Sequence, residues 1–148
     1  MKISTKGRYG IRILLDIALN DLGKPRLMRD IAKTQGISEK YISRLAIDLR
    51  VGGFINSARG ANGGYMLARF PRDIRLLDVV ETMEGPVSIV DCVNAPQACD
   101  RIATCPVRDI WVRVNDGIRD SFANITLQDV VNRHRNAAAE AGTPDYCI

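Results

Sequence analysis

Two short predicted helices that meet at a glycine, followed at once by a glycine-rich hairpin, constrain the fold of this 148-residue chain most strongly. The first helix ends near Gly36, and the second begins at Ser38, whose hydroxyl can accept from the free amides of a first helical turn. This helix-turn-helix pattern also suits any pair of helices in a helical core. Its apolar positions recur at helical spacing: Leu27, Ile31, Ala32, Tyr41, Ile42, Leu45, Ala46 and Leu49.

The residues after the second helix predict a β-hairpin, or wing. Residues 54–59 are strand-like, residues 60–64 form a turn rich in residues that tolerate positive φ, and residues 65–67 resume the strand. Arg59 falls at the tip, where a guanidinium could enter a DNA minor groove. An ordinary hairpin with an exposed arginine is the alternative. The expected fold is mainly α with a small β-hairpin wing, a winged helix-turn-helix.

The charges of the chain are divided unevenly along its length. Residues 1–75 hold 15 Lys and Arg against 6 Asp and Glu, a net charge of +9. Residues 76–148 hold 6 against 11, a net charge of −5. A basic half joined to an acidic half is typical of a nucleic-acid-binding module with a regulatory or assembly module. A solvated charged surface is the alternative.

Apolar periodicity also predicts an amphipathic helix over residues 8–21, a short helix over 76–83 and a long helix over 107–125. We expect the apolar face of the long helix to bury against a second copy of the chain, with packing on its own domain as the alternative. Thr126 is placed to cap one further helix. We therefore expect four segments: a winged helix-turn-helix at 1–85, a cysteine-containing cluster-binding loop at 86–106, the dimerisation helix and the following helix at 107–136, and a mobile tail at 137–148.

Three cysteines in the loop, Cys92-x6-Cys99-x5-Cys105, predict thiol chemistry. The first eight residues lack the apolar core of a signal peptide, and no apolar run is long enough to cross a membrane. We therefore expect a soluble, cytoplasmic protein with reduced thiols rather than disulfides. An iron–sulfur cluster, thiol redox sensing and zinc all remain open. The open spacing favours a cluster over zinc, which prefers Cys-x2-Cys pairs. We expect no enzyme, because no nucleophile–base pair, phosphate loop or carboxylate pair is evident.

These features together resemble the Rrf2 family of bacterial winged-helix regulators, from Met1 to about Val131. The most specific matches are MKISTKGRYG at residues 1–10, QGIS at 35–38, RGANGGY at 59–65, EGP at 84–86 and ITL at 125–127. The resemblance implies a homodimer built on the long helix, with a recognition helix in the major groove of an operator DNA and Arg59 in the minor groove. The implied DNA-binding residues are Lys6, Arg8, Ser38, Lys40, Tyr41, Ser43, Arg44, Ser57, Arg59 and Gly60.

In the cysteine-bearing members, of the IscR type, the resemblance implies that Cys92, Cys99 and Cys105 hold an iron–sulfur cluster. A two-iron two-sulfur cluster is favoured over a four-iron four-sulfur one. A labile cluster would suit a sensor of oxygen, nitric oxide or cluster supply. The alternative is a cofactor-free repressor of the CymR type, gated by thiol redox chemistry or by a partner enzyme.

The chain departs from the family pattern at several positions. Arg108 stands where IscR-type members carry a histidine ligand, and Arg8 stands where NsrR-type members use an acidic residue of the partner. Both are permanent cations and cannot bind iron. Ser43-Arg44 replaces a common Glu-Gln pair, which predicts a different operator. The fourth ligand is open between a group of the partner subunit and these residues: Cys147, His134, Asp91, Asp100 and Asp109.

Overall fold

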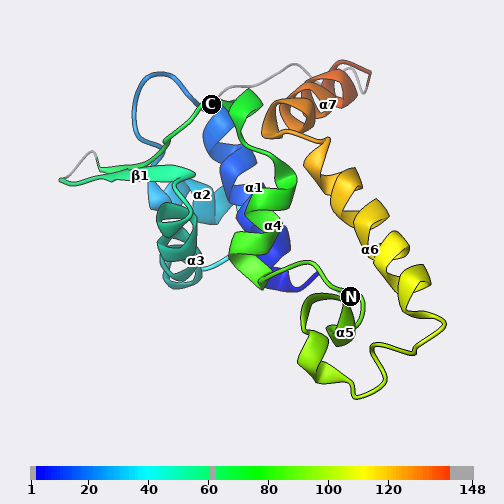
Figure 1. Cartoon of the computed structure of the whole chain (residues 1–148). Helices are drawn as coiled ribbons and strands as arrows, with labels where there is room; N and C mark the ends of the chain where they lie inside the picture. Colours follow the sequence, from blue (N-terminus) through cyan, green and yellow to red (C-terminus); the bar gives the residue numbers. More distant parts are fainter. Residues whose placement is uncertain (1–2, 61–62, 141–148) are drawn as a thin grey trace.

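The computed structural model describes residues 3–60 and 63–140, and it joins a helical body to a two-stranded hairpin (Figure 1). This confirms the predicted fold class of a mainly helical protein with a small wing. In the described ranges the elements are α1 (Thr5–Leu19), α2 (Met28–Gln35), α3 (Glu39–Val51), β1 (Ile55–Ala58), β2 (Gly64–Leu67), η1 (Pro71–Asp73), α4 (Leu76–Glu84), α5 (Asp91–Asn94), η2 (Pro96–Ala98), α6 (Arg108–Ala123) and α7 (Leu127–Glu140).

The hydrophobic core forms around α1, which contacts α2, α3, α4 and α7. Ile13 and Leu14 of α1 are fully buried, as are Ile31 of α2 and Leu49 of α3. Phe54, just before β1, closes the same cluster. The apolar stripes that the sequence predicted for the first three helices therefore face one another, and they pack the helix-turn-helix against the first helix.

The N-terminus of α1 is held by a carboxylate from α4. Glu84 Oε1 accepts from the Ser4 amide at 3.0 Å, the Ser4 hydroxyl at 2.7 Å and the Gly7 amide at 2.8 Å. Burial opposes the ionisation of Glu84, but the hydrogen bonds from Ser4 and Gly7, aided by the charge of Lys6, outweigh it and hold its pKa below the ordinary value. These hydrogen bonds join residues that are 77 and 80 positions apart in the sequence, and so connect α1 to α4.

A buried acidic side chain in α1 fixes the connection to α2. Asp16 accepts from Arg26 Nε at 2.9 Å, from Gln35 Nε2 at 3.0 Å and from the Thr34 hydroxyl. Such a buried charge is tolerated because its oxygens are paired and hydrogen-bonded. Arg26 also exchanges backbone hydrogen bonds with Tyr65 of β2, at 2.8 and 2.9 Å. The network therefore joins the α1–α2 connection to the base of the wing.

The wing pairs β1 and β2 as an antiparallel ladder, near the position predicted from sequence. Ile55 lies opposite Leu67, and Ala58 lies opposite Gly64. The inner residue Ile55 is buried, whereas the rest of β1 is exposed, so one end of the hairpin is anchored in the core and the other projects outward.

The predicted apolar stripe of the long helix divides into two parts in α6. Ile118 and Phe122 pack against Leu77 and Val80 of α4, next to an ion pair between Arg119 and Glu81. Four apolar side chains at the start of the stripe, the N-cap residue Val107 and three in α6, are 38% to 49% exposed: Val107, Ile110, Trp111 and Val114. Packing on its own domain therefore accounts only for the second half of the helix.

The end of α6 is joined to the start of α4 by a backbone bridge. The Leu76 amide donates to the Ile125 carbonyl at 2.9 Å, and the Leu127 amide donates to the Ile74 carbonyl at 2.8 Å. As predicted, Thr126 caps α7: its hydroxyl and amide bond Asp129 at 2.7 and 2.8 Å, which lowers the pKa of that carboxyl.

The last helix continues beyond the boundary that the sequence suggested. Residues 137–140, expected to begin a mobile tail, belong to α7. Residues 141–148, with Cys147, lie outside the described residues. None of the helices in the described ranges combines the length and the apolar composition that crossing a membrane requires.

We predict that Glu84→Ala lowers the free energy of unfolding at neutral pH by about 1 kcal/mol, a value typical of a helix cap at an exposed site. Because the pKa of Glu84 is lowered on folding, its ionised form stabilises the fold at neutral pH. This contribution is lost as the pH falls from the ordinary value of 4.5 through the folded-state pKa. Urea unfolding followed by circular dichroism should therefore show a difference between variant and wild type that shrinks in acid.

The control for this prediction is Glu140→Ala, at the C-terminal end of α7, which should leave the unfolding curve unchanged. A difference between Glu84→Ala and wild type that stays the same at acid pH would contradict the capping role.

Candidate functional site

The exposed face of α3 carries the first group of predicted site residues. Ser38 is the N-cap of α3, and its hydroxyl accepts from the Tyr41 amide at 3.2 Å, as the sequence predicted. Lys40 and Arg44 are exposed on the helix that follows. A hollow of about 470 Å³ lies beside them, between α3 and α1. It is lined by Lys6, Tyr41, Arg44, Leu45, Ile47 and Asp48.

Two of the predicted base-reading residues also have packing roles. Tyr41 is half-buried and meets the Tyr9 ring edge-on, with the ring centroids 6.0 Å apart. Ser43 is half-buried, and its hydroxyl donates to the Met28 sulfur at 3.1 Å. These contacts direct both side chains partly toward the protein, so the exposed cations Lys40 and Arg44 are the more accessible groups on this helix.

The predicted phosphate contacts of α1 lie next to α3. Lys6 forms an ion pair with Asp48 of α3 at 2.9 Å, and both side chains are partly exposed. Arg8 is exposed, and its Nε donates to the Ser4 carbonyl at 3.4 Å. Asp48 places a carboxylate at the edge of a basic surface, a feature that the sequence did not reveal because it depends on how α1 and α3 pack.

The wing contributes the last predicted DNA-binding residues. Ser57, Arg59 and Gly60 are all exposed. Gly60 has a φ of +101°, which only glycine adopts without strain, and this allows the chain to turn immediately after Arg59. Figure 1 shows α3 and the wing on one side of the molecule and α6 on the other. The two elements that carry these exposed cations therefore lie on the same side of the molecule.

The cysteine loop (residues 86–106) contains two short helical pieces, although the sequence showed no periodicity there. Cys92 lies in α5 and is half-buried, Cys99 follows η2 and is exposed, and Cys105 is half-buried just before α6. All three are free thiols. α5 packs against α6 and η2, so the loop has a defined fold around the start of α6.

The cysteine loop carries the donor groups that an iron–sulfur cluster requires, but not their arrangement. Thiolates are suitable donors. Within the described ranges, however, no three His, Cys, Asp or Glu side chains come together as a group that could hold a metal ion. The cysteine loop, as folded in this structure, supplies the donors without assembling them into a ligand set.

The structure also places the possible fourth ligands. Asp91, Asp100 and Asp109 are exposed in or beside the cysteine loop. His134 lies in α7, at the opposite end of α6 from the cysteine loop (Figure 1). Arg108 is the first residue of α6, and its Nε is buried without a hydrogen-bond partner among the described residues. The Arg108 side chain as a whole is half-buried.

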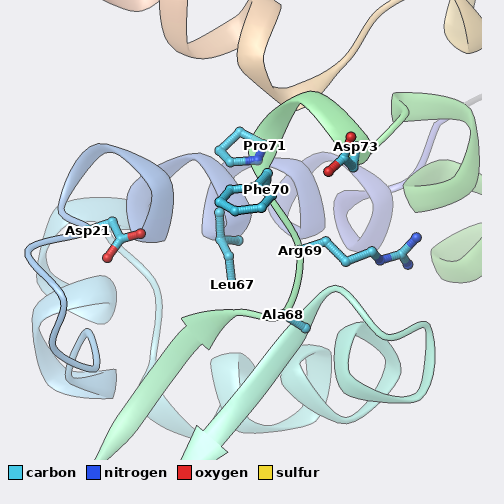
Figure 2. Close-up of a pocket in the computed structure, with 7 residues that line it drawn as sticks. All are labelled: Asp21, Leu67, Ala68, Arg69, Phe70, Pro71 and Asp73. Carbon is cyan, nitrogen blue, oxygen red and sulfur yellow. The ribbon is translucent and has the colours of Figure 1, made fainter.

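A second hollow lies away from every predicted site residue. Figure 2 shows Phe70 and Pro71 above Leu67, with Asp21 and Asp73 on either side. Its volume is about 430 Å³. Phe70 is exposed, and the Arg72 guanidinium lies 4.9 Å from its ring centre. No residue pattern in the sequence marked this hollow.

Known proteins similar to this chain are transcriptional regulators rather than enzymes, in agreement with the sequence-based expectation. The Rrf2 family model, described as an iron-dependent transcriptional regulator, matches residues 3–133. The protein rrf2 of Nitratidesulfovibrio vulgaris is 40% identical over 131 residues, which cover 88% of this chain and 87% of that protein.

Two solved structures share both fold and sequence with the chain. CymR (YrzC), the global cysteine regulator of B. subtilis, matches with a TM-score of 0.75 and 34% identity over 90% of this chain and 98% of that one. T. potens IscR matches with a TM-score of 0.74 and 34% identity over 93% of this chain and 90% of that one. The chain belongs to the Rrf2 family of transcriptional regulators.

Proposed function

We propose that the chain is a homodimeric transcriptional regulator that binds operator DNA through α3 and the wing and senses its signal through the cysteine loop. The observation that carries this proposal is that Lys40 and Arg44 of α3 and Arg59 of the wing are all exposed, and that α3 and the wing lie on the same side of the molecule (Figure 1). A helix with exposed cations and an adjacent cationic wing fits a major groove and the neighbouring minor groove.

Within this interface the side chains have distinct roles. Lys6 and Arg8 contact phosphates, which supply affinity and orientation without reading sequence. Arg44 donates to a guanine edge, and Lys40 reaches a base or the backbone near it. Arg59 enters the minor groove. Lys6 would exchange Asp48 for a phosphate when DNA binds, because the pair is exposed enough to open at little cost.

The exposed stripe of α6 (Val107, Ile110, Trp111 and Val114) supports a dimer built on this helix. Four large apolar side chains at three- and four-residue spacing form a continuous exposed stripe. Figure 1 shows α6 on the side of the molecule away from α3. A second copy of the same helix is apolar in the same way and can cover it. A two-fold pair would then present two recognition helices to two half-sites of one operator.

For the sensing step we propose an iron–sulfur cluster bound through Cys92, Cys99 and Cys105, with a two-iron cluster favoured. The family description as iron-dependent and the likeness to IscR support this. The equal likeness to CymR supports the second candidate, a cofactor-free regulator gated by thiol chemistry or a partner protein. Because the loop leads directly into α6, either kind of change there would reach the dimer helix.

We predict that Arg44→Ala weakens binding to the preferred operator by about tenfold or more and relaxes the preference at one base pair in each half-site, since one guanine contact is lost. Fluorescence anisotropy on operator and base-substituted duplexes would measure both effects. Arg72→Ala, which removes an exposed arginine beside Phe70, is the matched control. Equal losses on all duplexes would assign Arg44 to the phosphate backbone instead.

We predict that Ile110→Glu makes the protein monomeric at micromolar concentration, because a charge in the apolar interface has no partner. Sedimentation equilibrium would measure the state. Asp116→Lys is the control: it changes the charge on the side of α6 opposite the exposed stripe, and it should leave the dimer intact. A dimer that survives Ile110→Glu would show that another surface joins the subunits.

We predict that protein purified without oxygen contains iron and acid-labile sulfide, and that a Cys92→Ala, Cys99→Ala, Cys105→Ala variant contains neither, because its thiolates are gone. Metal and sulfide analysis with a visible spectrum would measure this. The triple variant should remain dimeric but change its DNA affinity or preferred site. Wild-type protein that takes up no iron or sulfide on reconstitution would favour the cofactor-free candidate.

A further inference from the structure

We propose that Ile47 is a specificity residue that contacts the 5-methyl group of a thymine in the major groove of the operator. This rests on the proposed DNA-binding function, and it assigns a base preference to a residue that neither the motifs nor the comparisons single out.

Ile47 lies on the same line of the α3 surface as the exposed cations of that helix. Lys40, Arg44 and Ile47 are separated by four and three residues, so they lie along one line of the helix surface. Ile47 also lines the hollow beside α3 together with Arg44. The aliphatic side chain therefore belongs to the same surface as the cations that approach DNA.

Ile47 is far more exposed than the neighbouring apolar side chains of α3. The other apolar side chains in the middle of α3 are at most 3% exposed, whereas Ile47 is 54% exposed. Ile47 takes no part in the hydrophobic core that surrounds Leu45 and Leu49. Its apolar area is thus left open on a charged surface, where the bound DNA would cover it.

The DNA major groove offers an aliphatic side chain one specific apolar partner. Thymine is the base that presents a methyl group in the major groove, and an apolar side chain that cannot form hydrogen bonds distinguishes it by contact alone. Along α3, Ile47 lies about 4.5 Å beyond Arg44, which compares with about 3.4 Å between successive bases of one strand. A guanine read by Arg44 would therefore have a thymine one or two steps away.

Val51 provides a comparison on the same helix. It is 80% exposed, more than Ile47, but it is the last residue of α3 and does not line the hollow. Val51 lies four residues further than Ile47 from the N-terminal part of the helix, through which recognition helices mainly contact bases. If exposure alone decided contact with a base, substitution of Val51 would change the thymine preference more than substitution of Ile47. The position of Ile47 in the hollow predicts the opposite order.

The experiment uses the full chain, which first selects its preferred binding sites from a pool of random DNA duplexes. Each thymine of the selected site is replaced in turn by deoxyuridine, which removes only the methyl group. For wild type we expect about fourfold weaker binding at one thymine in each half-site, the size expected for one buried methyl group. Ile47→Ala should bind the thymine site several-fold more weakly and show no difference between thymine and deoxyuridine. Val51→Ala should keep the wild-type difference.

The outcomes separate this inference from the function on which it rests. Failure of the wild type to enrich any sequence would overturn the DNA-binding function and this inference with it. A selected site that binds equally well with thymine and deoxyuridine, or a thymine preference that persists in Ile47→Ala, would overturn the role of Ile47 alone. Thermal unfolding of Ile47→Ala should match wild type, since the side chain is outside the core, and this excludes a folding defect as the cause.

Discussion

The contact between the Glu84 carboxylate and the N-terminus of α1 fixes where the first helix meets α4. It joins the first helix to the last turn of α4, and it lies one residue before Gly85, where the chain turns toward the cysteine loop. Two glycines make this approach possible. A Cβ on Gly7 would lie 2.6 Å from Glu84 Oε1, and one on Gly10 would lie 2.9 Å from Met83 Cγ. The basic residues at the start of α1 and the cysteine loop are thus positioned from the same junction.

The cysteine loop is also tied to the middle of α6. Asn115 is the buried polar residue of that helix, and its Oδ1 accepts from the Ile89 amide at 3.1 Å. This bond lies between the part of α6 that packs on α4 and the part whose apolar face is open. A change in the fold of the loop would therefore act on α6 at the boundary between its two parts. That geometry suits either form of signal, a bound cluster or a modified thiol.

Local patterns in the sequence predicted most of the elements, because apolar periodicity and capping residues act over a few positions. The Ser38 and Thr126 caps and the hairpin of the wing are examples. Contacts between distant segments were not predictable in this way. The Glu84 cap and the Asp16 network join residues that only the packing of α1 brings together. The geometry of the cysteines was also out of reach, because the loop between Gly85 and α6 lacks the repeating pattern that fixes the position of a helix.

The backbone bridge at the end of α6 has a mechanical consequence. The Leu76 amide donates to the Ile125 carbonyl and the Leu127 amide donates to the Ile74 carbonyl, so the chain is held just after the C-terminal end of α6, while the other end of the helix follows the cysteine loop. Over its 16 residues α6 extends about 24 Å, so a tilt of about 5° at the fixed end would move the far end by about 2 Å. The helix would therefore move as a rod that is held at one end. Displacement would be smallest at the fixed end and largest at the end next to Cys105, so a rearrangement of about 2 Å there would correspond to a tilt of α6 of only about 5°.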